Sequence, residues 1–245
     1  MVGRAAAVLR APRVAAFVAL AAALAAYYAG SESLWTAGKW WNIAWLSFVL
    51  IPAVFGLVWL VLPFVRARGL VAIALAFGAV AAIAEISGAG TVANFAKLGG
   101  ITAAAFWFLG WFETLPWVVF VATLIPFVDA YSVWRGPTHH IVTKKKELFT
   151  ELSFLFPVPG EHAWANLGLP DLLFFAIFLA ACVRFGLRTS WTWLAMVASF
   201  GVTLALSVEF NRNGVAALPG LSIALLAVNA DLVWRAVRSA RAARR

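Results

Sequence analysis

Two aspartates in strongly apolar stretches of this 245-residue chain are the residues best suited to chemistry. Asp129 lies in the sequence LIPFVDAYSVW and Asp171 in the sequence LGLPDLLFFAIF. An ionisable side chain at membrane depth costs about 2.5–3.5 kcal/mol on insertion scales, so it usually faces a cavity and has a function. The alternative for each acid is structural, as a helix cap or as a carboxyl that hydrogen-bonds between helices.

The spacing of the two acids predicts that they face each other. Residues 135–162 join their two helices, which therefore run antiparallel and enter from the same face. At helical rise, Asp129 lies about 9 Å and Asp171 about 13 Å from that face. Two carboxylates together in a low dielectric share one proton. The charged partner can then take a proton from water while the neutral partner protonates a carbonyl oxygen, which is the chemistry of peptide hydrolysis.

Breaks in the helical pattern fall at the same depth. Pro219 in the last apolar run lies about 9 Å from that face by the same arithmetic. Gly168 and Pro170 precede the second acid, and Pro126 lies one turn before the first. Irregular backbone at membrane depth is tolerated only where it lines a cavity or packs on protein. The alternative is a set of ordinary proline kinks, but three breaks at one level favour a cavity beside the acids.

The composition requires a membrane around these elements. The chain is 64% hydrophobic and only 12% charged, which excludes an ordinary soluble domain. A spanning helix needs about 20 apolar residues, and the first run could instead be a signal peptide, although no convincing cleavage site follows it. The predicted fold class is therefore all-α, a polytopic transmembrane helical bundle of about eight helices, with nine as the alternative. The eight runs are 14–30, 42–64, 69–88, 92–112, 114–134, 163–183, 190–208 and 214–234.

The basic residues flank the apolar runs, as they do in membrane proteins, so the net charge of +9 does not indicate a nucleic-acid partner. With the N-terminus inside, 12 of the Lys and Arg residues fall in inner segments and seven in outer ones. The positive-inside rule therefore predicts a multi-pass membrane protein with both termini in the cytoplasm. The cluster Lys144–Lys146 argues for the opposite orientation.

At the acids and the last proline, the chain resembles the presenilin and signal peptide peptidase family of intramembrane aspartyl proteases. That family carries Tyr-Asp, Gly-x-Gly-Asp and Pro-Ala-Leu in three successive motifs. The segment from Asp129 to Val133, with Thr138 and His139 downstream, is similar to archaeal members. The matching stretches here are Val128-Asp129, Gly168-Leu169-Pro170-Asp171 and Pro219-Gly220-Leu221.

The resemblance covers residues 114–235, including the connecting loop 135–162. It makes residues 1–113 an N-terminal group of about four helices and 236–245 a basic tail. It implies a short prokaryotic homologue in the cell membrane that cleaves transmembrane segments, such as signal-peptide remnants or single-span proteins. The family uses no cofactor. The implied catalytic residues are Asp129 and Asp171, and the implied substrate-binding residues are Gly168, Leu169, Pro170, Leu218, Pro219, Gly220 and Leu221.

Two other functions stay open. Each motif departs from the family at one position, and Pro170 adds bulk where the family has glycine, so a catalytically silent peptide-binding homologue is one alternative. A proton-coupled transporter or channel, in which the two acids relay protons, is the other. No inverted repeat of the kind that such transporters often have is visible. Membrane lipid is an expected partner in every case, and the oligomeric state is open.

The remaining polar residues have structural interpretations. Asp231 is expected to pair with an arginine or water, and Cys182 to be a small buried hydrophobe. His139, His140 and His162 lack the spacing of zinc ligands, so no metal site is expected. The segment Glu147–Phe156 is either an amphipathic helix at the interface or a solvated connector.

Overall fold

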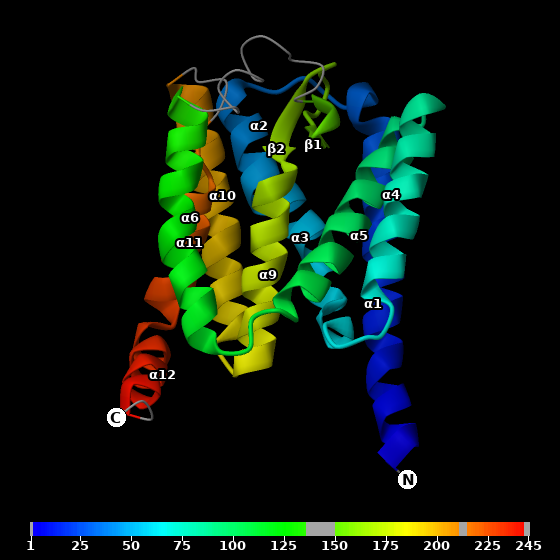
Figure 1. Cartoon of the computed structure of the whole chain (residues 1–245). Helices are drawn as coiled ribbons and strands as arrows, with labels where there is room; N and C mark the ends of the chain where they lie inside the picture. The colour runs from blue at the N-terminus through cyan, green and yellow to red at the C-terminus, as the bar shows by residue number, and fades with distance from the viewer. Residues whose placement is uncertain (1, 136–149, 211–214, 243–245) are drawn as a thin grey trace.

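The chain folds into a bundle of helices with a small two-stranded sheet at one end (Figure 1). The computed structural model describes residues 2–135, 150–210 and 215–242. Three short elements are η1 (Ser31–Ser33), the π-helical turn η2 (Leu46–Leu50) and η3 (Leu62–Phe64). The other elements are α1 (Val2–Gly30), α2 (Lys39–Trp45), α3 (Ile51–Leu60), α4 (Leu70–Ile86), α5 (Gly90–Leu109), α6 (Leu115–Arg135), β1 (Ser153–Pro157), β2 (Trp164–Gly168), α9 (Leu169–Phe185), α10 (Thr189–Glu209), α11 (Leu218–Val228) and α12 (Ala230–Ala242).

Several of these helices could cross a membrane, in agreement with the predicted multi-pass protein. Within the described residues, five helical segments are long and apolar enough, and the bent pair α11 and α12 makes a sixth if it counts as one span. The expected count of eight is not confirmed. The five are Ala11–Ser33, Lys39–Phe64, Gly90–Leu109, Leu115–Ser132 and Thr189–Glu209.

Two predicted runs differ from the elements that form. The run 163–183 begins with strand β2, and α9 starts only at Leu169. The run 214–234 is divided into α11 and α12, which meet at an angle of 75°. The fold is thus mostly helical but not all-α, because two five-residue strands precede α9, one of them inside the predicted run 163–183.

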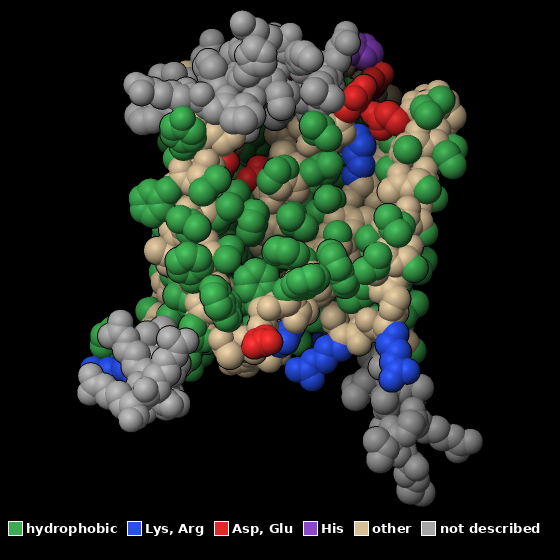
Figure 2. Space-filling model, viewed as in Figure 1, with side chains coloured by type: hydrophobic (Ala, Val, Ile, Leu, Met, Phe, Trp, Pro, Cys, Tyr) green, Lys and Arg blue, Asp and Glu red, His purple; other side chains and the backbone are tan. Residues whose placement is uncertain are grey.

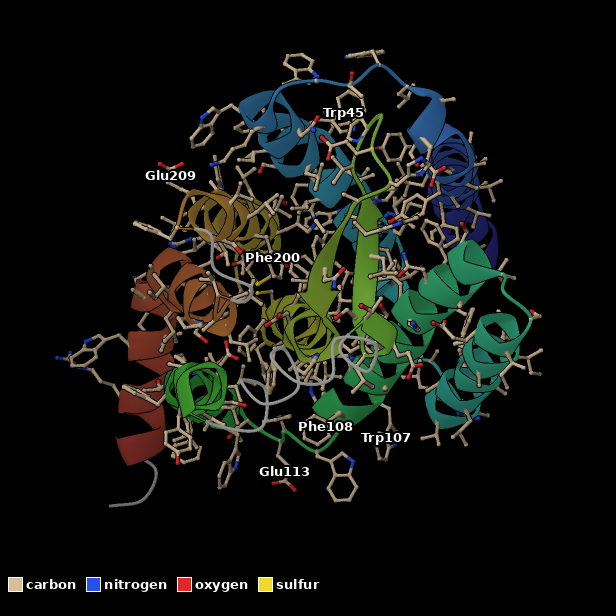
Figure 3. The ribbon with its side chains drawn as sticks, turned by 90° about the horizontal axis from the view of Figure 1, so that it is seen from above. Trp45, Trp107, Phe108, Glu113, Phe200 and Glu209 are labelled. Atoms are coloured by element: carbon tan, nitrogen blue, oxygen red, sulfur yellow. The ribbon has the colours of Figure 1, made fainter. Side chains whose placement is uncertain are left out.

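Helix α9 forms the centre of the bundle, as the view from above shows (Figure 3). Every residue from Phe175 to Cys182 is buried, and a helix that is apolar all round belongs in a core. The rings of Phe55, Phe175 and Phe200 join α3, α9 and α10, with centroids 4.1 Å apart for Phe55 and Phe175 and 4.9 Å apart for Phe55 and Phe200. The burial of Cys182 confirms its interpretation as a small core residue.

The two ends of the bundle differ in charge. Both termini lie at the end opposite the sheet (Figure 1). Most of the Lys and Arg side chains visible in Figure 2 gather at the end that carries the termini, where an acidic side chain also lies, whereas the other end shows acidic and histidine side chains. Charged rims on either side of an apolar middle are the surface that a membrane-spanning bundle needs.

Buried Asn229 fixes the bend between α11 and α12. Its carbonyl accepts the backbone N–H of Arg188 at 2.8 Å, and its amide donates to Thr192 Oγ1 at 2.8 Å and to the Leu225 carbonyl at 2.9 Å. Arg188 also donates to both carboxylate oxygens of Asp231, at 2.7 and 2.8 Å, which confirms the expected arginine partner. The turn before α10 is thereby tied to the end of α11.

The substitution Asn229→Leu is expected to lower the free energy of unfolding by about 1–3 kcal/mol, because it leaves buried hydrogen-bonding groups without a partner. Thermal unfolding of the purified protein in detergent would measure the loss. Asp231→Asn is the matched control, since its ion pair is solvent-exposed and contributes little. Equal unfolding temperatures for Asn229→Leu and the unsubstituted protein would contradict the role of Asn229.

Candidate aspartate site

Asp129 lies near the end of α6 and reaches the start of α11. Its Oδ2 accepts a hydrogen bond of 3.1 Å from the backbone N–H of Leu218, the first residue of α11. The first N–H groups of a helix have no partner within the helix, and a carboxylate beside them is favourable. Asp129 therefore caps a helix that lies 89 positions away in the sequence.

Asp171 occupies the third position of α9, whose N-cap residue is Gly168. The backbone N–H of Gly168 donates to the Asp171 carboxylate, the same return contact that the third residue makes in a capping box. Pro170 fits between them because a helix tolerates proline in its first turn. The helix-capping role considered for both acids is thus present in the structure, alongside any chemistry.

Gly168 also allows the close approach of Asp171. A Cβ atom at position 168 would lie 3.2 Å from Asp171 Oδ2, which is tighter than ordinary van der Waals contact. A side chain there would press on the carboxylate and shift it. Glycine at this position therefore preserves the placement of the acid.

The two acids lie close together. The carboxylates of Asp129 and Asp171 are near enough to repel each other electrostatically, and α6, α9 and α11 all contact one another. Each aspartate is at most partly exposed. Figure 2 shows acidic side chains recessed in the half of the bundle nearest the sheet. Two carboxylates and the amino-terminal ends of α9 and α11 thus lie in one region of the bundle, with the carboxylates within electrostatic reach of each other.

The other residues that the sequence assigned to substrate binding surround this point in different ways. Leu218 and Leu221 are buried in the core, so Leu218 reaches the acids through its backbone rather than its side chain. A Cβ atom on Gly220 would lie 3.1 Å from Ser199 Cβ, so Gly220 packs against α10. Leu169 and Pro219 are partly exposed, and Pro170 is exposed.

The β-hairpin, which the sequence analysis missed, leads directly into Asp171. Strands β1 and β2 are antiparallel, with Ser153 opposite Gly168 and Pro157 opposite Trp164. Strand β1 replaces the C-terminal part of the helix or connector considered for residues 147–156, whose first three residues lie outside the described part of the chain. The dipeptide Pro159-Gly160 between two short segments was the available turn signal.

One edge of β2 faces the acids. Backbone groups of an antiparallel strand point alternately to its two sides. The backbone N–H of Leu155 bonds to a side chain on the side of β1 away from β2, so the backbone groups of Leu155 point away from β2. Asn166 lies opposite Leu155 and therefore points its own N–H and C=O away from β1. Gly168, two residues on, points its N–H the same way and bonds Asp171. Among the described residues the Asn166 backbone has no hydrogen-bond partner, so within that part of the chain this edge of β2 is unpaired and leads to Asp171.

The described residues contain no group of three or more His, Cys, Asp and Glu side chains that could hold a metal ion. His139 and His140 lie outside the described part of the chain. His162 contacts Glu32, with 3.1 Å between Nδ1 and Oε2, and both side chains are exposed. Glu85 Oε2 lies 3.2 Å from the Lys97 ammonium.

No protein-family model matches the chain, and neither a curated protein nor a solved structure does.

Proposed function

We propose that the chain is an intramembrane aspartyl protease that hydrolyses peptide bonds within transmembrane segments. The observation that carries this proposal is that Asp129 lies within electrostatic reach of Asp171, which directly follows a strand whose outer edge is unpaired among the described residues. The resemblance of the three sequence motifs to presenilins and signal peptide peptidases supports it. Signal-peptide remnants and single-span proteins are the proposed substrates.

In the proposed reaction the two carboxylates share one proton. The ionised carboxylate takes a proton from water as the water oxygen attacks the scissile carbonyl carbon, and the neutral carboxyl gives its proton to the carbonyl oxygen. The tetrahedral intermediate then breaks its C–N bond as the carboxyl that took the water proton passes that proton to the leaving nitrogen, and the other carboxylate takes a proton from a hydroxyl group of the intermediate. The backbone N–H groups of Leu218 and Gly168 hold the two carboxylates in place through these steps.

A transmembrane substrate must lose its helical hydrogen bonds at the cleavage site. In the intact helix those bonds occupy the carbonyl oxygens, and the coiled backbone keeps the scissile bond from reaching the acids. In the membrane interior a freed backbone needs new partners. The N–H and C=O of Asn166 offer them, so an unwound segment can add to β2 as a further strand. A segment held there would pass beside Asp171.

The proposed location is a prokaryotic cell membrane with both termini in the cytoplasm. The gathering of basic side chains at the end that carries the termini supports this orientation (Figure 2). Transmembrane peptides and membrane lipid are the proposed partners, and no nucleic acid is included.

The decisive experiment is cleavage of a model transmembrane peptide by the detergent-purified full chain, with mass spectrometry of the products. Wild-type protein is expected to cut the peptide, and the double variant Asp129→Asn/Asp171→Asn is expected to leave it intact. Asp231→Asn is the matched control, because this aspartate pairs with Arg188 at the other end of the bundle.

Proton flux in liposomes, measured on the same preparations, separates the alternatives. Flux without cleavage, lost in the double variant, would favour the transporter. Peptide binding without either activity would favour the silent homologue.

A further inference from the structure

One buried asparagine closes the outer edge of β1. Asn94 on α5 is 2% exposed, its Nδ2 donates to the Leu155 carbonyl at 2.9 Å, and its Oδ1 accepts the Leu155 N–H at 2.8 Å. A side-chain amide carries the same donor and acceptor as a peptide group. Asn94 therefore makes the pair of hydrogen bonds that a neighbouring strand would make, and no further strand can pair with β1 at Leu155.

Two tyrosines of α1 extend this contact along the strand. Tyr28 donates to the Leu155 carbonyl at 2.7 Å, and Tyr27 donates to the Pro157 carbonyl at 2.9 Å. The Tyr28 side chain is itself buried against Phe95, with ring centroids 5.0 Å apart. Helices α1 and α5 thus hold β1 from the side opposite β2.

The hairpin turn is fixed to the same part of the chain. The Gly160 N–H donates to the Ser31 carbonyl at 2.8 Å, and Asn42 Nδ2 donates to Glu161 Oε1 at 2.8 Å. Gly160 has φ of +69°, and a Cβ atom there would lie 2.7 Å from the backbone N of Thr36. Only glycine fits both this conformation and this contact.

We propose that Asn94 is a positioning residue that directs an extended substrate to β2, an inference that rests on the proposed protease function. A hairpin of two strands is marginally stable by itself, so it needs an external support to present a defined edge. Asn94 supplies that support. Its hydrogen bonds to Leu155 also block the outer edge of β1, which could otherwise compete with β2 for the substrate. The open edge at Asn166 is then the one that ends at Asp171. A rigid edge lowers the ordering cost of substrate binding.

The test replaces Asn94 with leucine in the full-length chain and measures two quantities. Amide hydrogen exchange of β1 and β2 is expected to quicken by about tenfold or more, because Leu155 loses both bonds to Asn94. KM for a model transmembrane peptide is expected to rise by about tenfold with kcat nearly unchanged, because the acids stay in place while the edge becomes less ordered.

Two further variants keep this test independent of folding and of the proposed function. Thr102→Val removes another buried polar group of α5 and is expected to change neither quantity. Tyr28→Phe removes one of the two donors to the Leu155 carbonyl and is expected to give a smaller change of the same kind, which keeps the test usable if Asn94→Leu does not fold.

In a folded Asn94→Leu protein, unchanged exchange and unchanged KM would overturn the inference. If the wild-type protein cuts no peptide, the proposed function fails, and exchange alone still decides whether Asn94 orders the hairpin. Exchange that quickens equally in Thr102→Val would also overturn the specific role of Asn94.

Discussion

The substitution Asp171→Asn is expected to lower kcat for cleavage of a transmembrane peptide by at least about 10³-fold, with little change in KM. Asparagine has nearly the same shape as aspartate, and its carbonyl oxygen can still accept the Gly168 N–H that caps α9. It cannot exchange a proton with water or with substrate. The loss therefore falls on the chemical step rather than on folding or binding.

Asp129→Asn is expected to cause a loss of the same order, because its carbonyl can likewise keep the Leu218 contact while proton transfer is lost. Initial rates over a range of peptide concentrations, together with unfolding temperatures of all variants, would measure these effects. The two single substitutions and the double variant should give similar residual rates, since groups that act as one unit are not additive. Retention of more than a tenth of the wild-type kcat in either single variant would contradict the shared-proton mechanism.

The sequence predicts the position of the acids better than the boundaries of the helices that carry them. Depth arithmetic puts Asp129, Asp171 and Pro219 at one level, because helical rise is the same in every spanning helix. The structure brings Asp129 to Leu218, next to Pro219, and within electrostatic reach of Asp171. Their chemical role remains a prediction.

The hairpin and the bend at Asn229 could not be read from apolar runs. Trp164–Gly168 continues into α9 with no change in polarity, so a hydropathy argument merges strand and helix. What makes Trp164–Gly168 a strand is its pairing with β1, and β1 is itself held by a tertiary contact in which the side chain of Asn94 satisfies the backbone of Leu155 across 61 positions. Likewise α11 and the start of α12 form one apolar run in the sequence, and their bend depends on contacts of Asn229 with the turn before α10.

Residues 1–113, for which no family motif was found, take part in the site through these contacts. Tyr27, Tyr28 and Asn94 hold β1, the partner of the strand that precedes Asp171, although they lie far from it in sequence. A lone asparagine in an apolar helix gives no hint of its partner before folding. The N-terminal helices are therefore a support for the hairpin as well as part of the bundle.

The substitution Leu218→Pro is expected to lower the cleavage rate by about 10²-fold relative to Leu218→Ala, because a hydrogen bond to a charged group contributes about 1.5–3 kcal/mol. Proline removes the N–H that Asp129 accepts, and the first position of a helix tolerates proline. Alanine removes the same buried side chain but keeps the N–H. The ratio of the two rates therefore isolates the backbone donor from the loss of packing.

Both variants lose core contacts, so each must be compared at a temperature well below its own unfolding transition. Without the Leu218 N–H, the Asp129 carboxylate has no backbone donor to orient it toward Asp171, and sharing of a proton becomes less favourable. Equal cleavage rates in Leu218→Pro and Leu218→Ala would show that α11 contributes packing alone. A slower Leu218→Pro with unchanged KM would instead assign the start of α11 to the chemical step, which is the role that the geometry around Asp129 supports.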